Sequence, residues 1–267
     1  MSISFDRQII GNKFKTKLVS DDFDIILGFD LMHGIGDAMV ALSIIQDIVS
    51  EHQNPKIVFC SCLDNNFEIE NLLEIFDIRC DEVIQTEKLQ QFVSNGKEVF
   101  EEKYLSQNNQ FFSFWDIINF NYVEKIKKIL LKIESVDLNK YFQVDDYLEI
   151  VSVQPYSFNK EGYAKIGEQL DFIRDRWNNI FDSNPDSLFL LLGSENDKNV
   201  GQFHQKNVVS LIGQTTLKES CEIILSCNRH MAIESWSQIF CHLIGKQNVQ
   251  FWDFNVFEIY KYMIGGN

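Results

Sequence analysis

Short apolar segments alternate with longer amphipathic ones along the first third of the chain. The apolar segments have the length and β-branched content of buried strands, and the longer ones have helical spacing. Such alternation is typical of βαβ units and predicts a parallel sheet. The predicted strands are residues 24–30, 56–62 and 82–85, and the predicted helices are residues 37–52 and 65–76.

A second series of the same kind begins near residue 148. Thr216 and Glu219 form a Thr-x-x-Glu capping box at the start of one of its helices. Ser235 and Gln238 have the spacing of another capping box, and Gly245 occupies the position just past that helix. The predicted strands are residues 148–155, 187–192, 207–211, 229–233 and 249–252, and the helices are 160–177, 216–226 and 235–244.

The stretch between the two series is harder to interpret. Residues 115–133 have the spacing of a long amphipathic helix, and the polar stretch over 137–147 is typical of a linker. We therefore predict an α/β protein with two Rossmann-like domains, residues 1–145 and residues 146–267. Open parallel sheets bind ligands beyond the carboxyl ends of their strands, so the chemistry is expected in a cleft where the two domains face each other.

Charge argues against a nucleic-acid partner. The 267 residues include 24 Lys and Arg against 39 Asp and Glu, so the net charge is −15, whereas phosphate recognition needs a basic face. The richest basic stretch, VEKIKKILLKI over residues 123–133, is read as the solvent face of a helix. Contact of this face with an anionic membrane surface is the alternative.

Hydropathy and cysteine spacing favour a cytoplasmic protein. No apolar run approaches the ~20 residues that span a bilayer, and the N-terminus lacks a signal-peptide core. The six cysteines include no Cys-x-x-Cys pair, so neither a zinc site nor another metal centre is expected. In a cytoplasmic protein they are most simply reduced and buried.

Candidate chemistry begins at the glycine turn after the first strand. Gly34 and Gly36 precede a helix, but the third glycine of a dinucleotide fingerprint is replaced by Met39. Asp37, at the helix start, has two interpretations: it is the N-cap, or it is a general base facing the cleft. His33 beside this turn is the histidine that merits a test.

Two further turns carry polar groups after strands of the second series. Lys160 in VQPYSFNK is either a phosphate ligand or a solvated loop residue. Glu234 and Ser235 either bind a ribose and a phosphate or only stabilise the following helix. Neither a Gly-x-Ser-x-Gly elbow nor a P-loop is present.

Taken together, these segments resemble the family 9 glycosyltransferases, the bacterial heptosyltransferases of lipopolysaccharide cores. GIGDAMVALSII is similar to the family's N-terminal Gly-Asp turn, and VQPYSFNKEGY to the strand and Lys that open the second domain. LFLLLGSEND and NVVSLIGQTTLKESCEIILSC are similar to the segments that follow, and the second of them is the best match. IESWSQIFCHLIGK resembles the family's nucleotide-binding segment, but Glu234, Trp236 and Ile239 replace its Asp, Gly and His.

The resemblance implies the GT-B architecture and an inverting, metal-independent transfer from a nucleotide sugar, without a further cofactor. It also implies that Asp37 is the base, that Lys160 and the helix near Ser235 stabilise the leaving diphosphate, and that Glu234 binds the ribose. The acceptor is a glycan or a lipid-linked hydroxyl, and the tail over residues 254–266 packs back on the N-terminal domain. The remaining donor-site residues are Gly34, Gly36, Ser157, Glu195, Thr215, Trp236 and Ser237.

Two other functions stay open for the same fold. One is a nucleotide-sugar hydrolase or epimerase, which needs no acceptor. The other is a catalytically silent binding or scaffold protein, which the family residues missing at Trp236 and Ile239 favour.

Overall fold

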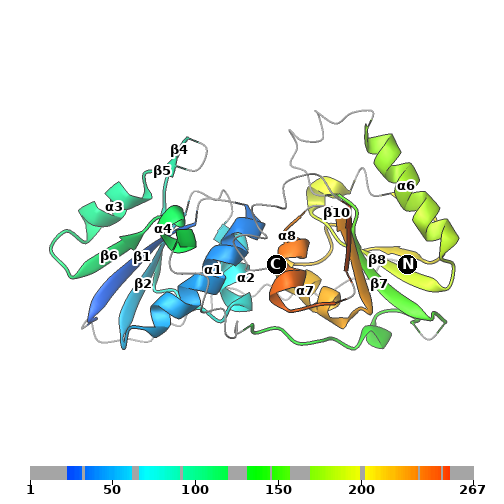
Figure 1. The fold of residues 1–267 in the computed structure, drawn as a ribbon, viewed down its shortest axis with the longest axis horizontal. Helices are drawn as coiled ribbons and strands as arrows, with labels where there is room; N and C mark the ends of the chain where they lie inside the picture. Colours follow the sequence, from blue (N-terminus) through cyan, green and yellow to red (C-terminus); the bar gives the residue numbers. More distant parts are fainter. Residues whose placement is uncertain are drawn as a thin grey trace.

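The protein contains two open, all-parallel sheets, each built from one half of the chain (Figure 1). The computed structural model describes residues 23–31, 34–61, 66–90, 93–119, 131–144, 146–156, 169–198, 202–233, 235–247 and 249–252.

The first sheet has the strand order β3-β2-β1-β6. Its central strand β1 pairs with β2 over its whole length, in the register Ile25↔Pro55. Helices α1 and α2 lie on the face of this sheet that is turned toward the second sheet, and α3 lies on the opposite face (Figure 1). The elements are β1 (Ile25–Leu31), α1 (Ile35–Ser50), β2 (Pro55–Ser61), α2 (Asn66–Ile75), β3 (Glu82–Gln85), α3 (Gly96–Lys103), β6 (Asn109–Phe112) and α4 (Phe114–Asn119), with a short hairpin of β4 (Lys88–Gln90) and β5 (Val93–Ser94).

The second sheet has the strand order β11-β10-β7-β8-β9. Helix α6 covers its outer face, while α7 and α8 cover the face toward the first sheet (Figure 1). The elements are β7 (Glu149–Gln154), α6 (Gln169–Ser183), β8 (Ser187–Leu191), β9 (Val208–Ser210), α7 (Leu217–Ser226), β10 (Arg229–Ile233), α8 (Trp236–Leu243) and β11 (Val249–Trp252), with single 3-10 turns at Leu138–Lys140 and Glu195–Asp197.

Helices α1, α2, α7 and α8 form a layer between the two sheets (Figure 1). Helix α1 packs against α8, and α2 packs against α7. One buried apolar cluster runs through this layer, from Phe29 on β1 to Leu190 on β8. The Lys218 ammonium pairs with Glu74 across the α2–α7 contact, and Val136 N donates to Ser226 Oγ at 2.7 Å. The two sheets therefore share a continuous core.

Most predicted elements are confirmed, but two helices differ from the prediction. The helix predicted over 115–133 is wrong at its end: residues 131–133 are not helical, and 120–130 lie outside the described residues. There Lys132 N donates to Ile75 O at 2.7 Å, and Leu131 and Ile133 pack on the core at alternate positions, as in an extended segment.

Helix α6 ends six residues beyond its predicted end, at Ser183. Its buried stripe continues past Trp177 to Phe181, and the two rings stack with centroids 5.8 Å apart. These are i, i+4 neighbours on one helix face, and their burial against the second sheet extends the helix.

The close approach of α3 to the first sheet depends on Gly28. A Cβ at this position of β1 would lie 2.6–2.8 Å from three ring atoms of Phe100, which is fully buried. We expect Gly28→Ala to lower the free energy of unfolding by about 1–3 kcal/mol, because the Phe100 ring is fully buried and the core around it must shift. Urea unfolding measures the change. In a Phe100→Leu background the added cost of Gly28→Ala should shrink, and equal costs in both backgrounds would contradict the steric explanation.

Candidate functional site

Each sheet has a topological switch point, where strands are added on opposite sides of the first strand. It lies between β1 and β6 in the first sheet and between β7 and β10 in the second. Ligands of open parallel sheets bind beyond the carboxyl ends of the strands at such points. Helices α1 and α8 begin directly after β1 and β10 and pack against each other (Figure 1). The starts of these two helices therefore define the candidate site.

The start of α1 carries Asp37. Gly34 is the N-cap of this helix and Asp37 lies in its first turn, so the interpretation of Asp37 as the N-cap is wrong. The half-buried carboxylate reaches back toward the cap, since a Cβ at Gly34 would lie 4.0 Å from Asp37 Oδ2. The dipole of α1 stabilises a negative charge at this position.

Gly36 lies where the starts of the two helices touch. A Cβ on Gly36 would lie 2.7 Å from Ile239 Cδ1 and 3.5 Å from Trp236 Cα, both on α8. The absence of a side chain at Gly36 therefore allows α1 and α8 to approach closely. Trp236 and Ile239 are two of the positions that depart from the family pattern, and here they fill this junction.

The start of α8 does not have the predicted capping box. Ser235 is the N-cap, but its side chain makes no capping hydrogen bond. Its hydroxyl instead donates to Gln154 Oε1 at 2.8 Å, and it lies 2.8 Å from Ser237 Oγ. The prediction of a Ser235/Gln238 box failed because a partner on the neighbouring strand competes for the hydroxyl. Gly245 past the helix has φ +66°, as predicted for that position.

A buried histidine, which sequence reasoning passed over, continues this network. His230 on β10 lies between Ser237 Oγ and Ser152 Oγ, each 2.9 Å from a ring nitrogen. All three side chains have no exposed surface. Burial lowers the pKa of His230 to about 3, so the ring is neutral. A lone histidine in an apolar strand gives no sequence signal of these partners.

Glu195, which begins the 3-10 turn after β8, and Thr215, which precedes the cap of α7, lie at the same carboxyl edge of the second sheet. Gly213 turns back with φ +64°, and a Cβ there would lie 2.7 Å from Glu195 Oε2. Glu195 also pairs with Lys198 at 2.6 Å, and Thr215 Oγ1 lies 2.8 Å from Ser220 Oγ. Both predicted residues are thus on the edge where the donor is expected, although each has a partner within its own loop or helix.

Asp30 is a second carboxyl group at the edge of the first sheet. It lies near the end of β1, is 5% exposed, and accepts from Ser94 Oγ at 3.2 Å to each oxygen. Burial raises its pKa to about 7, and the Ser94 hydroxyl only partly offsets that effect. Sequence reasoning missed Asp30 as a functional candidate, because a residue 64 positions away creates its environment.

Three predicted site residues lie outside the described residues: Ser157, Lys160 and Glu234. His33 and the tail over residues 254–266 lie outside them as well. Of the predicted site, the described residues are thus Gly34, Gly36, Asp37, Glu195, Thr215, Ser235, Trp236 and Ser237.

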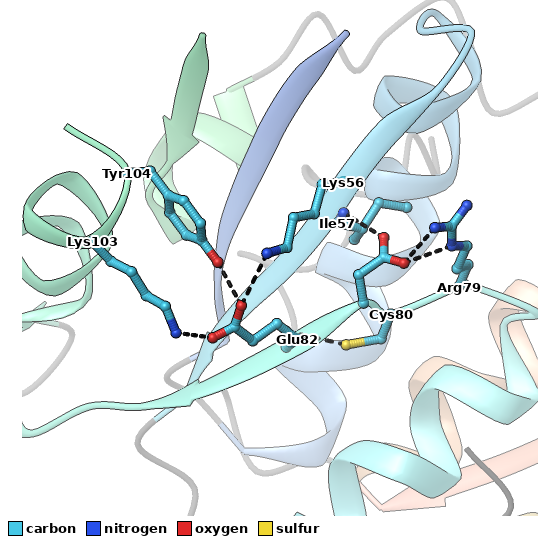
Figure 2. Close-up of polar contacts among 8 residues, drawn as sticks. Lys56, Ile57, Arg79, Cys80, Glu82, Lys103 and Tyr104 are labelled. Carbon is cyan, nitrogen blue, oxygen red and sulfur yellow. Dashed lines mark hydrogen bonds and ion pairs between the residues drawn. The ribbon is translucent and has the colours of Figure 1, made fainter. Parts of the chain in front are cut away.

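A charged cluster at the opposite, amino-terminal end of the first sheet has a structural role. Glu82, the first residue of β3, accepts from Tyr104 at 2.6 Å and pairs with Lys103 and Lys56 (Figure 2). Burial alone raises the pKa of Glu82, but these partners outweigh it and hold the pKa below its usual value. These contacts hold the end of α3 against β2 and β3.

A polar hollow of about 520 Å³ lies beside α6. Its lining comes from α6 and from the segment before β9, and includes Arg174, Asp182 and His204. None of its lining residues belongs to the start of α1 or of α8, so the hollow is not part of the candidate site.

The architecture is of the GT-B type, with two Rossmann-like units that pack through α1, α2, α7 and α8. The ADP-heptose lipopolysaccharide heptosyltransferase II of E. coli has a similar fold, with a TM-score of 0.50 and 10% identity over 87% of this chain and 91% of that chain. A family 9 glycosyl transferase of Veillonella parvula DSM 2008 gives a TM-score of 0.49 and 11% identity over 90% and 89%. A Listeria monocytogenes structure described as a putative UDP-N-acetylglucosamine 2-epimerase gives 0.45 and 10% over 79% and 74%.

The likeness is one of fold, and it agrees with the family resemblance of the motifs. No protein-family profile and no curated protein sequence matches the chain. Among the described residues, no helix has both the length and the apolar content needed to cross a bilayer.

Proposed function

We propose that the protein transfers a sugar from a nucleoside-diphosphate donor to a hydroxyl group of a glycan or lipid-linked acceptor. The junction of α1 and α8 is the observation that supports this most. It brings together the carboxyl edges of both sheets, one carrying Asp37 and the other carrying Gln154, Ser235 and Ser237. A base on one side and hydrogen-bonding groups on the other are what such a transfer needs.

In the proposed reaction, an acceptor oxygen attacks the anomeric carbon as its proton passes to the Asp37 carboxylate. The bond from that carbon to the diphosphate oxygen breaks, and the configuration at the anomeric carbon inverts. Negative charge grows on the diphosphate, where Lys160 and the start of α8 stabilise it. Glu234 binds the ribose, and Glu195 and Thr215 lie near the nucleotide. These fixed groups take the part that a metal ion plays in other transferases.

A silent binding protein is the second candidate, because one observation favours it. Trp236 and Ile239 stand in place of the family's Gly and His and fill the α1–α8 junction.

A nucleotide-sugar hydrolase or epimerase of the same fold is distinguished by its products, which are free sugar or an isomerised nucleotide sugar formed without acceptor.

Thermal unfolding against nucleotides and nucleotide sugars tests the donor site. At ~100 times its dissociation constant, a ligand adds about 2.7 kcal/mol to stability, which at roughly 2–4 °C per kcal/mol raises Tm by about 5–10 °C. We expect such a shift with one nucleoside diphosphate and its sugar, and its loss in Glu234→Ala. The absence of a shift with every ligand would leave the likeness as one of fold alone.

A further inference from the structure

Five polar side chains form an unbroken chain from the core of the second unit to its carboxyl edge. Ser152 on β7 contacts His230 on β10, and His230 contacts Ser237 on α8. Ser237 contacts Ser235, whose hydroxyl reaches Gln154 at the end of β7. Each link is 2.8 or 2.9 Å, and four of the five residues are at most 3% exposed. We call these five residues the His230 relay.

The hydrogens of the relay can be ordered in one direction only. Gln154 Oε1 only accepts, so Ser235 donates its single hydroxyl hydrogen to it. Ser237 must then donate to Ser235, and His230 must donate to Ser237 from Nε2. In a neutral ring Nδ1 is left as an acceptor, and the Ser152 hydroxyl donates to it at 2.9 Å in preference to the Arg229 carbonyl at 3.4 Å.

This order decides what the end of β7 offers to a ligand. The carboxamide oxygen of Gln154 accepts from Ser235, and this bond fixes the orientation of the amide, with its two N–H donors on the side away from the Ser235 hydroxyl. Gln154 lies at the last position of β7, beside the switch point of the second sheet. An amide that presents its N–H donors suits an oxygen-rich ligand such as a diphosphate or a ribose.

We propose that Gln154 binds the nucleoside diphosphate through its amide N–H, and that His230 is the positioning residue that orients it through Ser237 and Ser235. The inference rests on the proposed function and adds to it the residue pair that presents the donor side. The relay is costly to leave half-satisfied, because four of its five members are buried in a low dielectric. A break at His230 therefore changes the hydrogen-bond order as far as the Gln154 amide at the end of β7.

Matched substitutions at both ends of the relay test this. Gln154→Glu keeps an acceptor for Ser235 but replaces the N–H donors with an anion. His230→Gln can keep a donor at the Nε2 position for Ser237, whereas His230→Asn is too short to reach it. Ser43→Ala removes a buried hydroxyl on α1, which bonds within its own helix at 2.6 Å, and serves as the control.

The measurement is the Kd for ADP, GDP and UDP by calorimetry, using the nucleotide that the wild type binds. We expect Gln154→Glu and His230→Asn to bind it about 10- to 100-fold more weakly, and His230→Gln and Ser43→Ala within about threefold of wild type. Equal affinity in all four variants would overturn the relay. No binding by the wild type would overturn the proposed function and, with it, the role of Gln154.

A second readout does not depend on any nucleotide. ¹⁵N spectra of the histidine-labelled, ligand-free protein report which ring nitrogen of His230 carries the proton. The relay requires the proton on Nε2. A proton on Nδ1 would reverse the hydrogen-bond order and contradict the inference even if the nucleotide binds.

Discussion

Asp37→Asn is expected to abolish most sugar transfer while leaving nucleotide binding intact. The carboxylate lies in the first turn of α1, and in the proposed reaction it accepts the proton of the acceptor hydroxyl. The amide has nearly the same shape but cannot take up that proton. A positioned base contributes about 10²- to 10⁴-fold, so turnover should fall by that factor while the nucleotide Kd stays near the wild-type value.

Asp47→Asn is the matched control, because Asp47 lies on the same helix but near its other end. It should leave turnover unchanged. If Asp37→Asn turned over normally and Asp30→Asn did not, the base would be Asp30, the buried carboxyl group on the neighbouring strand. If neither substitution affected turnover, no carboxylate at this edge would be the base.

Asp30 is expected to make the protein less stable as the pH rises from about 4 to about 7. Its pKa in the folded protein is raised to about 7 from an ordinary 3.8, chiefly by burial. Between these values the folded state binds a proton that the unfolded state has lost, so the free energy of unfolding falls with pH. At about 1.4 kcal/mol for each pH unit, the loss is on the order of a few kcal/mol.

Asp30→Asn should remove this decline and be more stable than wild type above pH 7. The quantity to measure is the difference between the two curves of unfolding free energy against pH, from urea titrations. The difference is needed because buried His230, with a pKa of about 3, changes stability in the opposite sense over an overlapping range. Asp24→Asn, at the exposed position just before the same strand, is the control. Parallel curves for wild type and Asp30→Asn would show that Asp30 titrates normally.

The sequence predicted those features that depend on neighbours along the chain. The capping box of Thr216 and Glu219 is present as predicted, because both partners lie within one helical turn. The same spacing at Ser235 and Gln238 does not form a capping box, because the Ser235 hydroxyl donates to Gln154, 81 residues away. Local patterns gave the strands and helices, whereas partners from other strands decided this hydrogen bond.

The parts of the site that sequence reasoning missed have the same cause. Asp30 is unusual only because it is buried beside Ser94, and His230 only because Ser152 and Ser237 face its two nitrogens. Strand β6 was not predicted either, since its four residues are fixed by pairing with β1 in the register Ile26↔Asn109. Contacts between distant segments leave no periodic signal in one sequence.

Hydrogen exchange with and without a saturating nucleotide sugar locates the ligand on the fold, and so tests whether the donor binds at the starts of α1 and α8. We expect slower exchange in the first turns of α1 and α8 and around Gln154, and unchanged exchange at the Glu82 cluster. Protection confined to the hollow beside Arg174, or no protection anywhere, would contradict the claim that the donor binds where the two sheets face each other.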